Sequence, residues 1–319
     1  MEGLFLARLF EPKGVAGLSH RSFYNAGMRK ALLVLSVVLI SLLGWGAPQT
    51  PSVQIGTFNL EFFTDFDRST GTWCEEHNPR TPQVVEELAR FIDSLDLEVL
   101  ALQEVENAQA LELLLSFMPP GKYGYILSPQ TTPETCQRVA VLYQKDEVSL
   151  QFVGEIPLSL GQYGLRNGLV VYGKVLPDGF DFTLVVVHLK AYTDLRSTSI
   201  REAQLSLLGE WVQRYIEDPT NDQDLILAGD FNERLLTNTR AWSLLDPKGF
   251  LYLVTKDAPD KRCRSWTDPI DHIVISQVQE YAGVAVFYDF FRDPALPNRY
   301  LYSDHCVLWA DFYTEDLDP

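Results

Sequence analysis

Basic residues are scarce in this chain: 26 Lys and Arg stand against 43 Asp and Glu in 319 residues, and the formal net charge is -17. This balance excludes a basic groove spread over the whole surface. An acidic protein can still hold a polyanion, but only at a place where a bound cation inverts the local field. With 46% hydrophobic and 22% charged residues, the composition is that of a globular protein with a sizeable core.

Long apolar runs are also rare, and the longest lies near the N-terminus. The basic pair Arg29 and Lys30 precedes Ala31–Leu43, thirteen residues that are apolar apart from two Ser, and a small-x-small pattern then ends at Gly46. This is typical of an export signal, and we expect cleavage near 46/47, with residues 1–47 forming an extension and signal. The protein would then be secreted or periplasmic. The alternative is an uncleaved membrane anchor, since the lengthened stretch reaches the lower limit for a span.

Cysteine is limited to four residues: Cys74, Cys136, Cys263 and Cys306. They show no CxxC spacing and no paired Cys/His spacing, so the sequence gives no sign of a structural zinc site. An exported protein can form disulfides, and we predict a bond between Cys74 and Cys136, which both lie in polar, turn-rich segments. Cys306 lies against an apolar run, where we predict a buried free thiol.

Beyond residue 52 there is no further linker, repeat or low-complexity tract, and we expect residues 48–319 to form one domain. Short apolar runs rich in Val, Ile, Phe and Tyr recur along it, which favours strands over helices. The predicted strands are Val53–Phe58, Val99–Leu102, Val139–Tyr143, Leu169–Val175, Phe182–Val187, Leu225–Ala228, Ile273–Ile275 and Val307–Phe312.

Two of these runs, at 185–187 and 225–227, are apolar on both faces, and such strands are covered on both sides. Helices are predicted between some strands. The pair Thr81-Pro82 is a good N-cap and first helical residue, and apolar residues follow it at helical spacing. Ser199 with Glu202 matches a capping box and predicts that another helix begins there. Sheets with helices on their outer faces therefore fit better than a bare sandwich.

Residues that bind metals or move protons lie at the ends of the apolar runs. If the last two strands run antiparallel to the first four, all these groups meet at one sheet edge. Their hard oxygen ligands suit Mg²⁺, Ca²⁺ or Mn²⁺ better than Zn²⁺, and water is the natural nucleophile because no Ser or Cys stands out as one. Four groups follow a run and two precede one: Asn59-Leu60-Glu61, Gln103-Glu104, His188-Leu189-Lys190, Asp230-Phe231-Asn232-Glu233, Asp271-His272 and Asp304-His305.

In this order the groups resemble the motifs of the endonuclease/exonuclease/phosphatase superfamily, which has the deoxyribonuclease I-like fold. Each motif alone is weak, but together they extend over nearly the whole chain after the signal. The resemblance implies an α/β (α+β) four-layer sandwich, in which two mostly antiparallel β-sheets pack face to face with helices on the outer faces. The matching motifs are Thr57-Phe58-Asn59, Leu102-Gln103-Glu104, His188-Leu189-Lys190, Gly229-Asp230-Phe231-Asn232, Ile270-Asp271-His272 and Ser303-Asp304-His305.

The same resemblance implies a set of metal ligands. Glu104 is the first candidate, because a carboxylate just past an apolar strand is costly to bury unpaired and a cation offsets that cost. Asn59 offers a neutral oxygen to the same ion or its waters, and Asp304 is expected to be a second metal contact. The expected cofactor is Mg²⁺, with Mn²⁺ or Ca²⁺ as alternatives.

Five residues are expected to carry the chemistry. The resemblance pairs His305, which would hold the attacking water or the phosphate, with Asp271, which would fix its tautomer. It matches Asp230 to the residue that orients or deprotonates water, and Asn232 to the one that bonds a nonbridging phosphate oxygen. His188 would donate to the phosphate or the leaving oxygen and stabilise developing charge.

Other polar residues are given lesser roles. Arg138 and Arg201 are candidates for substrate phosphate contacts, since phosphates favour Arg, although either could be an ordinary surface cation. His272 alternates along its strand with a catalytic candidate, and Gln103 and Glu61 alternate with the candidate ligands, so these three are expected to be structural.

The function implied by the resemblance is that of a secreted, divalent-metal-dependent phosphodiesterase. We expect a nuclease that cuts DNA or RNA by in-line attack of an activated water. We expect it to act as a monomer on its nucleic acid substrate, and the sequence points to no protein partner. The acidic chain would bind DNA weakly, with strong dependence on divalent ion and salt.

Three alternatives stay open. A sphingomyelinase-like enzyme would bind a phospholipid headgroup and would need an exposed aromatic loop, for which 288–291 is the candidate. An inositol-phosphate-type phosphatase would act on a phosphorylated small molecule and would need a basic cluster, and none stands out. A non-catalytic binding protein would be expected to lose site residues, whereas all six groups are filled here.

Overall fold

The computed structural model of the protein describes residues 52–67, 73–130 and 136–317. The export signal predicted within residues 1–47 lies outside them. The strands are β1 (Ser52–Phe63), β2 (Val99–Val105), β3 (Tyr123–Leu127), β4 (Arg138–Gln144), β5 (Val148–Ile156), β6 (Gly168–Val175), β7 (Asp181–His188), β8 (Leu225–Asp230), β9 (Tyr252–Leu253), β10 (Asp271–Ile275), β11 (Tyr281–Tyr288) and β12 (Val307–Tyr313). The helices are α2 (Trp73–His77), α3 (Pro82–Leu95), α4 (Ala108–Ser116), α5 (Leu195–Glu217) and α6 (Thr239–Leu245), with 3₁₀ turns η2 (Val254–Asp257), η3 (Phe290–Arg292) and η4 (Arg299–Leu301).

The strands form two six-stranded sheets, which confirms the predicted sandwich. The order is β11-β12-β1-β2-β4-β3 in the first sheet and β5-β6-β7-β8-β10-β9 in the second. Each sheet has one parallel pair, β1 with β2 and β7 with β8, and its other pairs are antiparallel. The late strands β10 and β12 run antiparallel to β8 and β1, as the sequence predicted. Every predicted apolar run lies within a strand.

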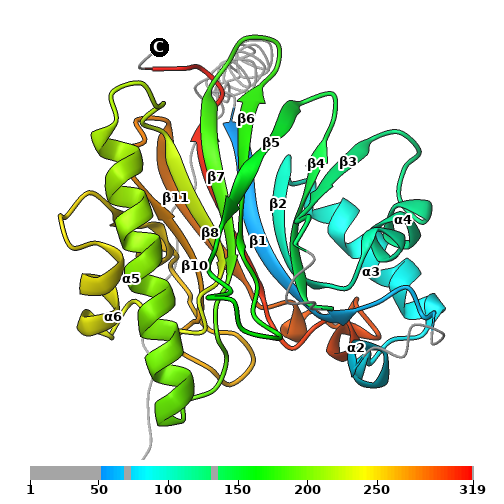
Figure 1. Ribbon diagram of the computed structural model, residues 1–319. Helices are drawn as coiled ribbons and strands as arrows, with labels where there is room; N and C mark the ends of the chain where they lie inside the picture. The colour runs from blue at the N-terminus through cyan, green and yellow to red at the C-terminus, as the bar shows by residue number, and fades with distance from the viewer. Residues whose placement is uncertain (1–51, 68–72, 131–135, 318–319) are drawn as a thin grey trace, which may run out of the picture. The chain divides into compact units, whose positions relative to one another are not determined.

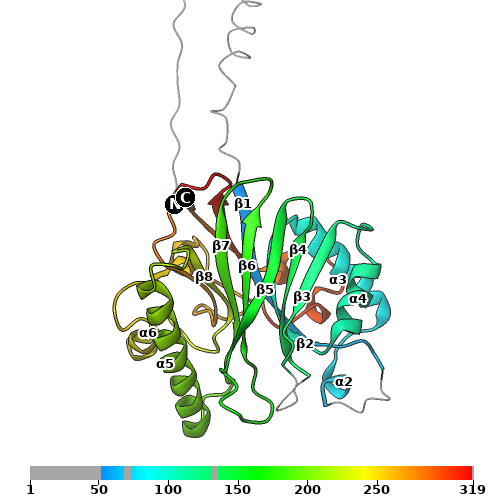
Figure 2. The same ribbon diagram turned by 45° about the horizontal axis from the view of Figure 1, so that its top comes forward.

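The central strands of the second sheet are covered on both faces, as their apolar runs predicted. On β8, Ile226 and Ala228 point into the core that the two sheets share, whereas Leu225 and Leu227 pack with residues of α5 and α6. The neighbouring strand β7 alternates in the same way. Helices α3 and α4 lie beside the first sheet and α5 and α6 beside the second (Figure 1), and the turned view keeps this arrangement (Figure 2).

The helix ends follow from local capping. Thr81 caps α3 as predicted, because its hydroxyl accepts a hydrogen bond from the Val84 N–H at 3.4 Å. The predicted start of α5 at Ser199 is wrong. The helix begins one turn earlier, where the Asp194 carboxylate accepts hydrogen bonds from the first free N–H groups, a role that Asp fills as well as Ser does. Within the described ranges, no helix has both the length and the apolar character that a membrane span requires.

Two disulfides join distant segments. The predicted bond between Cys74 and Cys136 is present. The prediction of a free thiol at Cys306 is wrong, because Cys306 is bonded to Cys263 and their Cα atoms are 5.7 Å apart. Cys306 is fully buried, and an apolar setting suits a disulfide as well as it suits a thiol, so the local pattern did not separate the two.

Removing the second disulfide should destabilise the protein. The bond closes a loop across 43 residues, and a double change Cys263→Ala and Cys306→Ala frees that loop in the unfolded chain. We expect the free energy of unfolding to fall by about 2 to 4 kcal/mol, measured by urea denaturation. The pair Cys74→Ala and Cys136→Ala should lose a similar amount, since its loop spans 62 residues. An unchanged denaturation midpoint in both would contradict the loop-closure argument.

Candidate active site

The groups predicted to meet do meet, at the sheet edge where β1, β2, β7 and β8 end and β10 begins. Asn59 of the first sheet reaches across to Asp230 of the second, with its Nδ2 3.1 Å from the Asp230 Oδ2 atom. The same nitrogen lies 3.2 Å from the Oε1 atom of Glu104. One amide group therefore links carboxylates from two strands in different sheets, so the site depends on the packing of the whole sandwich.

Asp230 is the centre of this arrangement. Its Oδ2 atom accepts a hydrogen bond from Asn232 Nδ2 at 3.0 Å. It also lies 3.5 Å from His188 Nε2 and 3.8 Å from His305 Nε2. The Asn232 N–H donates to the other oxygen, Oδ1, at 2.7 Å. Asp230 ends a fully buried strand, and the turn that follows has Asn232 at a φ of 50°, which brings both donors of that residue back onto the carboxylate.

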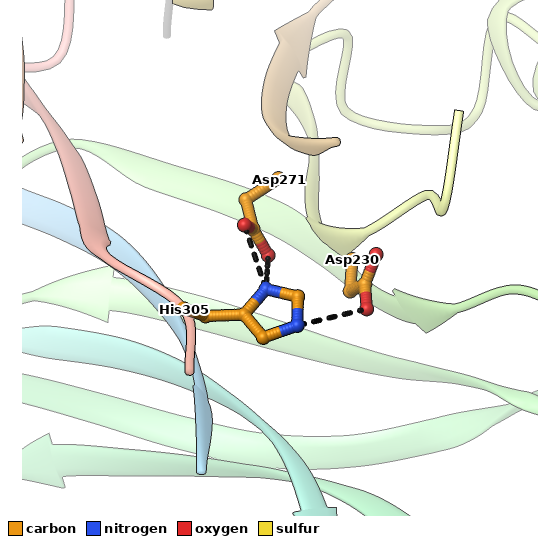
Figure 3. A group of neighbouring side chains, drawn as sticks. All are labelled: Asp230, Asp271 and His305. Carbon is orange, nitrogen blue, oxygen red and sulfur yellow. Dashed lines mark hydrogen bonds and ion pairs between the residues drawn. The ribbon is translucent and has the colours of Figure 1, made fainter. Parts of the chain in front are cut away.

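His305 is held by a carboxylate, as predicted. Its Nδ1 atom lies 3.0 and 2.9 Å from the two oxygens of Asp271, and its Nε2 atom points toward Asp230 (Figure 3). Burial alone would lower the pKa of His305, but the charge and hydrogen bond of Asp271, with Asp230 and Asp304 behind them, raise it well above the ordinary value. His305 is therefore a cation whose Nε2–H is aimed into the site.

The other two central groups respond in opposite ways to burial. Burial raises the pKa of Asp230 to about 7, helped by Asp271 and Glu104 and opposed by His305. Burial lowers the pKa of His188 well below its ordinary value, and the nearby Arg166 cation adds to the effect. His188 is therefore a neutral imidazole.

The direction of the Glu104 side chain follows from an irregularity in the pairing of β2. The register of β2 shifts between Leu102 and Val105, and Glu104 has a φ of 61°, which an ordinary strand residue does not adopt. The bulge turns the carboxylate toward the neighbouring strand. Its Oε2 atom accepts the Phe62 N–H at 2.9 Å, and its Oε1 atom lies 3.7 Å from His188 Nε2. Strain of this kind is stored where surrounding contacts fix it, as they do at functional sites.

Two buried arginines support the site, and the sequence did not indicate either. Arg166 donates from Nε to the His188 carbonyl at 3.2 Å and from Nη2 to the Leu189 carbonyl at 2.9 Å. Arg80 donates to the carbonyls of Leu60 and Tyr302, and to that of Glu61 at 2.7 Å. Burial lowers the pKa of each to about 10, against the pull of nearby carboxylates that include Glu104, so both stay charged at neutral pH.

Two carboxylates form the outer side of the site. Asp304 has an Oδ1 atom 3.7 Å from His305 Nε2, and 53% of its side chain is exposed. Glu61, which was predicted to be structural, interacts electrostatically with charged groups of the site. Burial and the charge of Asp304 raise the pKa of Glu61 to about 7, with Glu104 adding to the effect.

Arg201 is not brought into the site as a free cation. It is buried, its Nε atom bonds Glu233 Oε2 at 3.0 Å, and its Nη1 atom donates to the Lys190 and Tyr192 carbonyls. Arg201 therefore stabilises the loop after β7. Because its guanidinium already bonds Glu233 and these carbonyls, we no longer predict that it contacts a substrate phosphate.

Arg138 does lie at the relevant edge, since it pairs with Val105 at the end of β2. Its buried Nε atom has no hydrogen-bond partner. Its phosphate role stays a prediction.

Two of the residues that were predicted to be structural, Gln103 and His272, form hydrogen bonds within the fold. Gln103 exchanges hydrogen bonds with the Thr57 hydroxyl inside the first sheet. His272 is buried with its Nε2 atom 2.9 Å from the Glu233 carbonyl and its Nδ1 atom 3.3 Å from the Thr255 hydroxyl. Both therefore have partners outside the group of residues that surrounds Asp230.

A pocket of about 180 Å³ opens beside His305. Its lining includes Asp271 and Asp304, and also Trp266 and Arg234. Trp266 is 60% exposed, so its ring is free to contact a ligand. An aromatic face and a cation beside the reacting centre suit a planar or anionic part of a substrate.

The donors at the centre fit a hard divalent cation. Ligand atoms of Asp230, Asp271 and His305 lie within 4.8 Å of one another, and Glu104 reaches the same space through its contacts with Asn59 and His188. Burial makes the ionised form of Asp230 costly, and a cation would offset that cost. Asn59 turns its nitrogen to the carboxylates, because its oxygen accepts the backbone N–H two residues on. Glu104 and Asp230 are thus the ligands that the geometry favours.

Comparison with known proteins gives one family. The model of the Endonuclease/Exonuclease/phosphatase family matches residues 56–305. None of the curated proteins matches the chain by sequence.

Solved structures with the same fold are numerous, and three of them represent its range. An endonuclease/exonuclease/phosphatase family protein from Bacteroides thetaiotaomicron is 17% identical with a TM-score of 0.58, over 86% of this chain and 98% of that one. A mannosyl-6-phosphatase from the same species is 16% identical with a TM-score of 0.57, over 81% and 98%. TDP2 from D. rerio, in complex with a single-strand DNA product, is 16% identical with a TM-score of 0.57, over 82% and 98%. At these identities the likeness shows the fold.

Proposed function

This chain belongs to the endonuclease/exonuclease/phosphatase family, and we propose that it is a divalent-metal-dependent phosphodiesterase that hydrolyses DNA or RNA by in-line attack of an activated water. The observation that carries this proposal is the convergence on one Asp230 oxygen of Asn59, His188, Asn232 and His305, with Glu104 beside them. Enzymes of this family typically hydrolyse phosphoesters and usually use divalent metals.

The metal would be held by Glu104 and Asp230, with Asp304 at the exposed side. When bound, Mg²⁺ or a similar ion supplies positive charge that polarises the phosphate and offsets the charge that develops on it. Carboxylate oxygens are the ligands that this class of ion prefers.

The side chains of the chain itself have distinct tasks. His305 is charged and fixed by Asp271, so its Nε2–H can bind a phosphate oxygen or the attacking water. Asp230 is placed to orient that water and accept its proton. Neutral His188 presents Nε2–H to the same space and can stabilise charge on the phosphate or the leaving oxygen. Asn232 holds Asp230 in place, and its contact with a phosphate oxygen stays a prediction.

Nucleic acid is favoured over a lipid by two features of the structure. The pocket beside His305 offers the exposed Trp266 and the cation Arg234 to a base or a neighbouring phosphate. The candidate membrane loop at 288–291 does not have the required exposure, since Phe290 and Phe291 are buried in the core. A phosphorylated small molecule is the second candidate, because the pocket is compact and one protein of this fold is a mannosyl-6-phosphatase.

The test compares substrates with and without metal. The purified protein is incubated with supercoiled plasmid, single-stranded DNA, RNA, sphingomyelin and a sugar phosphate, in Mg²⁺, Mn²⁺ or Ca²⁺ and again in EDTA. We expect cleavage of at least one nucleic acid and its loss in EDTA and in Asp230→Asn. The nuclease proposal would be overturned if phosphate were released from the sugar phosphate faster than any nucleic acid is cleaved. The proposed metal dependence would be overturned if EDTA left cleavage unaffected.

We also propose that the protein acts outside the cytoplasm, since two disulfides and the N-terminal apolar run both suit export. N-terminal sequencing of the exported protein should find Ala47 or a near neighbour, and a retained Met1 would contradict cleavage.

A further inference from the structure

Three carboxylates outside the catalytic centre come together just past the ends of β1 and β2. Asp65 follows β1, Glu106 follows β2, and Glu75 lies in the short helix α2. One ligand oxygen from each lies within 4.8 Å of the others. The two strand ends are joined at this point, since the Glu106 N–H donates to the Phe63 carbonyl at 2.9 Å.

Two members of this group are deeply buried, and one of them has a carboxylate oxygen without a partner. Glu75 is only 7% exposed and Glu106 only 4%. The Oε1 atom of Glu75 is buried and has no hydrogen-bond partner. In the described ranges, neither Asp65 nor Glu75 forms an ion pair with Lys, Arg or His. A buried ionised carboxylate without a partner is strongly disfavoured, and it becomes tolerable if it loses its charge or binds a cation.

We propose that Asp65, Glu75 and Glu106 bind a structural divalent cation of the Ca²⁺ type, separate from the catalytic ion. The ligands are all oxygens and come from three separate segments, which suits the larger and more flexible coordination shell of Ca²⁺ better than the strict octahedron of Mg²⁺. Asp65 is already oriented for this role. Its Oδ1 atom accepts the Asp67 N–H at 2.8 Å and its Oδ2 atom accepts Asn107 Nδ2 at 3.0 Å.

The ion would stabilise segments that position the catalytic groups. Helix α2 has five residues, too few to be stable alone, and the disulfide of Cys74 anchors it on one side. The cation would tie it to the strand ends through Glu75. Those ends carry Asn59 and Glu104, and the Phe62 N–H that bonds Glu104 is three residues before Asp65. The Phe62 ring also packs on Trp73 of α2, with ring centroids 4.9 Å apart.

The test measures thermal stability and terbium binding in the full chain. An Asp230→Asn background weakens the catalytic site, and Glu75→Gln is compared with Glu76→Gln, an exposed neighbour on the same helix. We expect saturating CaCl₂ to raise the Tm by about 5 to 10 °C over EDTA in the background and in Glu76→Gln, and to raise it little in Glu75→Gln. Terbium(III) should give luminescence sensitised by Trp73, lost in Glu75→Gln and strongly reduced in Trp73→Phe.

Asp65→Asn provides a second variant in case Glu75→Gln does not fold, because Asp65 is only half-buried. It should lose the same calcium response. The proposal is overturned if either variant keeps the full Tm shift and the terbium signal. It is also overturned if Glu75→Gln is more stable than its background in EDTA and the background shows no calcium response, since Glu75 would then be a neutral acid.

Discussion

His305→Ala is expected to lower kcat/KM for a phosphodiester by about 10²- to 10³-fold, the usual effect of removing one positioned donor. The reason is that His305 is the charged donor whose Nε2–H faces the centre, 3.8 Å from Asp230 Oδ2, while Asp271 holds its other nitrogen. The side chain lies at the end of the sheet and is not part of the hydrophobic core, so the fold should persist. Steady-state kinetics and a denaturation curve on the same preparation separate the two effects.

Asp271→Asn tests whether the pair acts as a unit. Asparagine cannot supply the charge that keeps His305 protonated, so the single change should cost nearly as much as His305→Ala, and the double variant should be little worse than either. His77→Ala is the control, since His77 is exposed and lies outside the site. Full activity in His305→Ala, or losses that simply multiply in the double variant, would refute the assigned pairing.

The strands that sequence predicted and those it missed differ by their place in the sheets. All eight predicted runs became strands, whereas β3, β5, β9 and β11 were missed, and these four are the outer strands of the two sheets. An edge strand has one neighbouring strand and keeps more of its surface in water. Its sequence therefore contains more polar residues and lacks a clear apolar run. Strand β5 illustrates this, since several of its residues, among them Phe152 and Val153, are exposed.

The meeting of the candidate site residues could be predicted because each of them lies at the end of an apolar run. A carboxylate or an imidazole directly after a buried run, as in Glu104 and His188, demands an explanation that a surface residue does not. The supporting arginines give no such signal. Arg80 and Arg166 lie in loops, and their partners are backbone carbonyls, which any residue possesses. Arg201 was mistaken for a phosphate contact because the sequence does not show that it lies beside Glu233, 32 residues away along the chain.

Arg166 therefore gives the sharpest test of what sequence could not show. Arg166→Met removes the donors to the carbonyls of Gly164, His188 and Leu189 and the buried positive charge near Glu104 and Asp230. We expect the free energy of unfolding to fall by about 3 to 5 kcal/mol, as when one partner of a buried charged network is removed.

Activity should fall with stability in Arg166→Met, because the same guanidinium fixes the backbone on which His188 is mounted. Arg166→Lys should recover part of the stability through its charge, yet less of the activity, since a single ammonium cannot reproduce the planar fork that reaches three carbonyls. Arg90→Met is the matched control: that arginine is exposed and pairs with Glu86 one turn away, so its loss should cost less than about 0.5 kcal/mol. Urea denaturation of the three variants ranks them directly. If Arg166→Met were as stable as Arg90→Met, the buried cation would not be what holds the end of β7 in place, and the fixed position of His188 would need another cause.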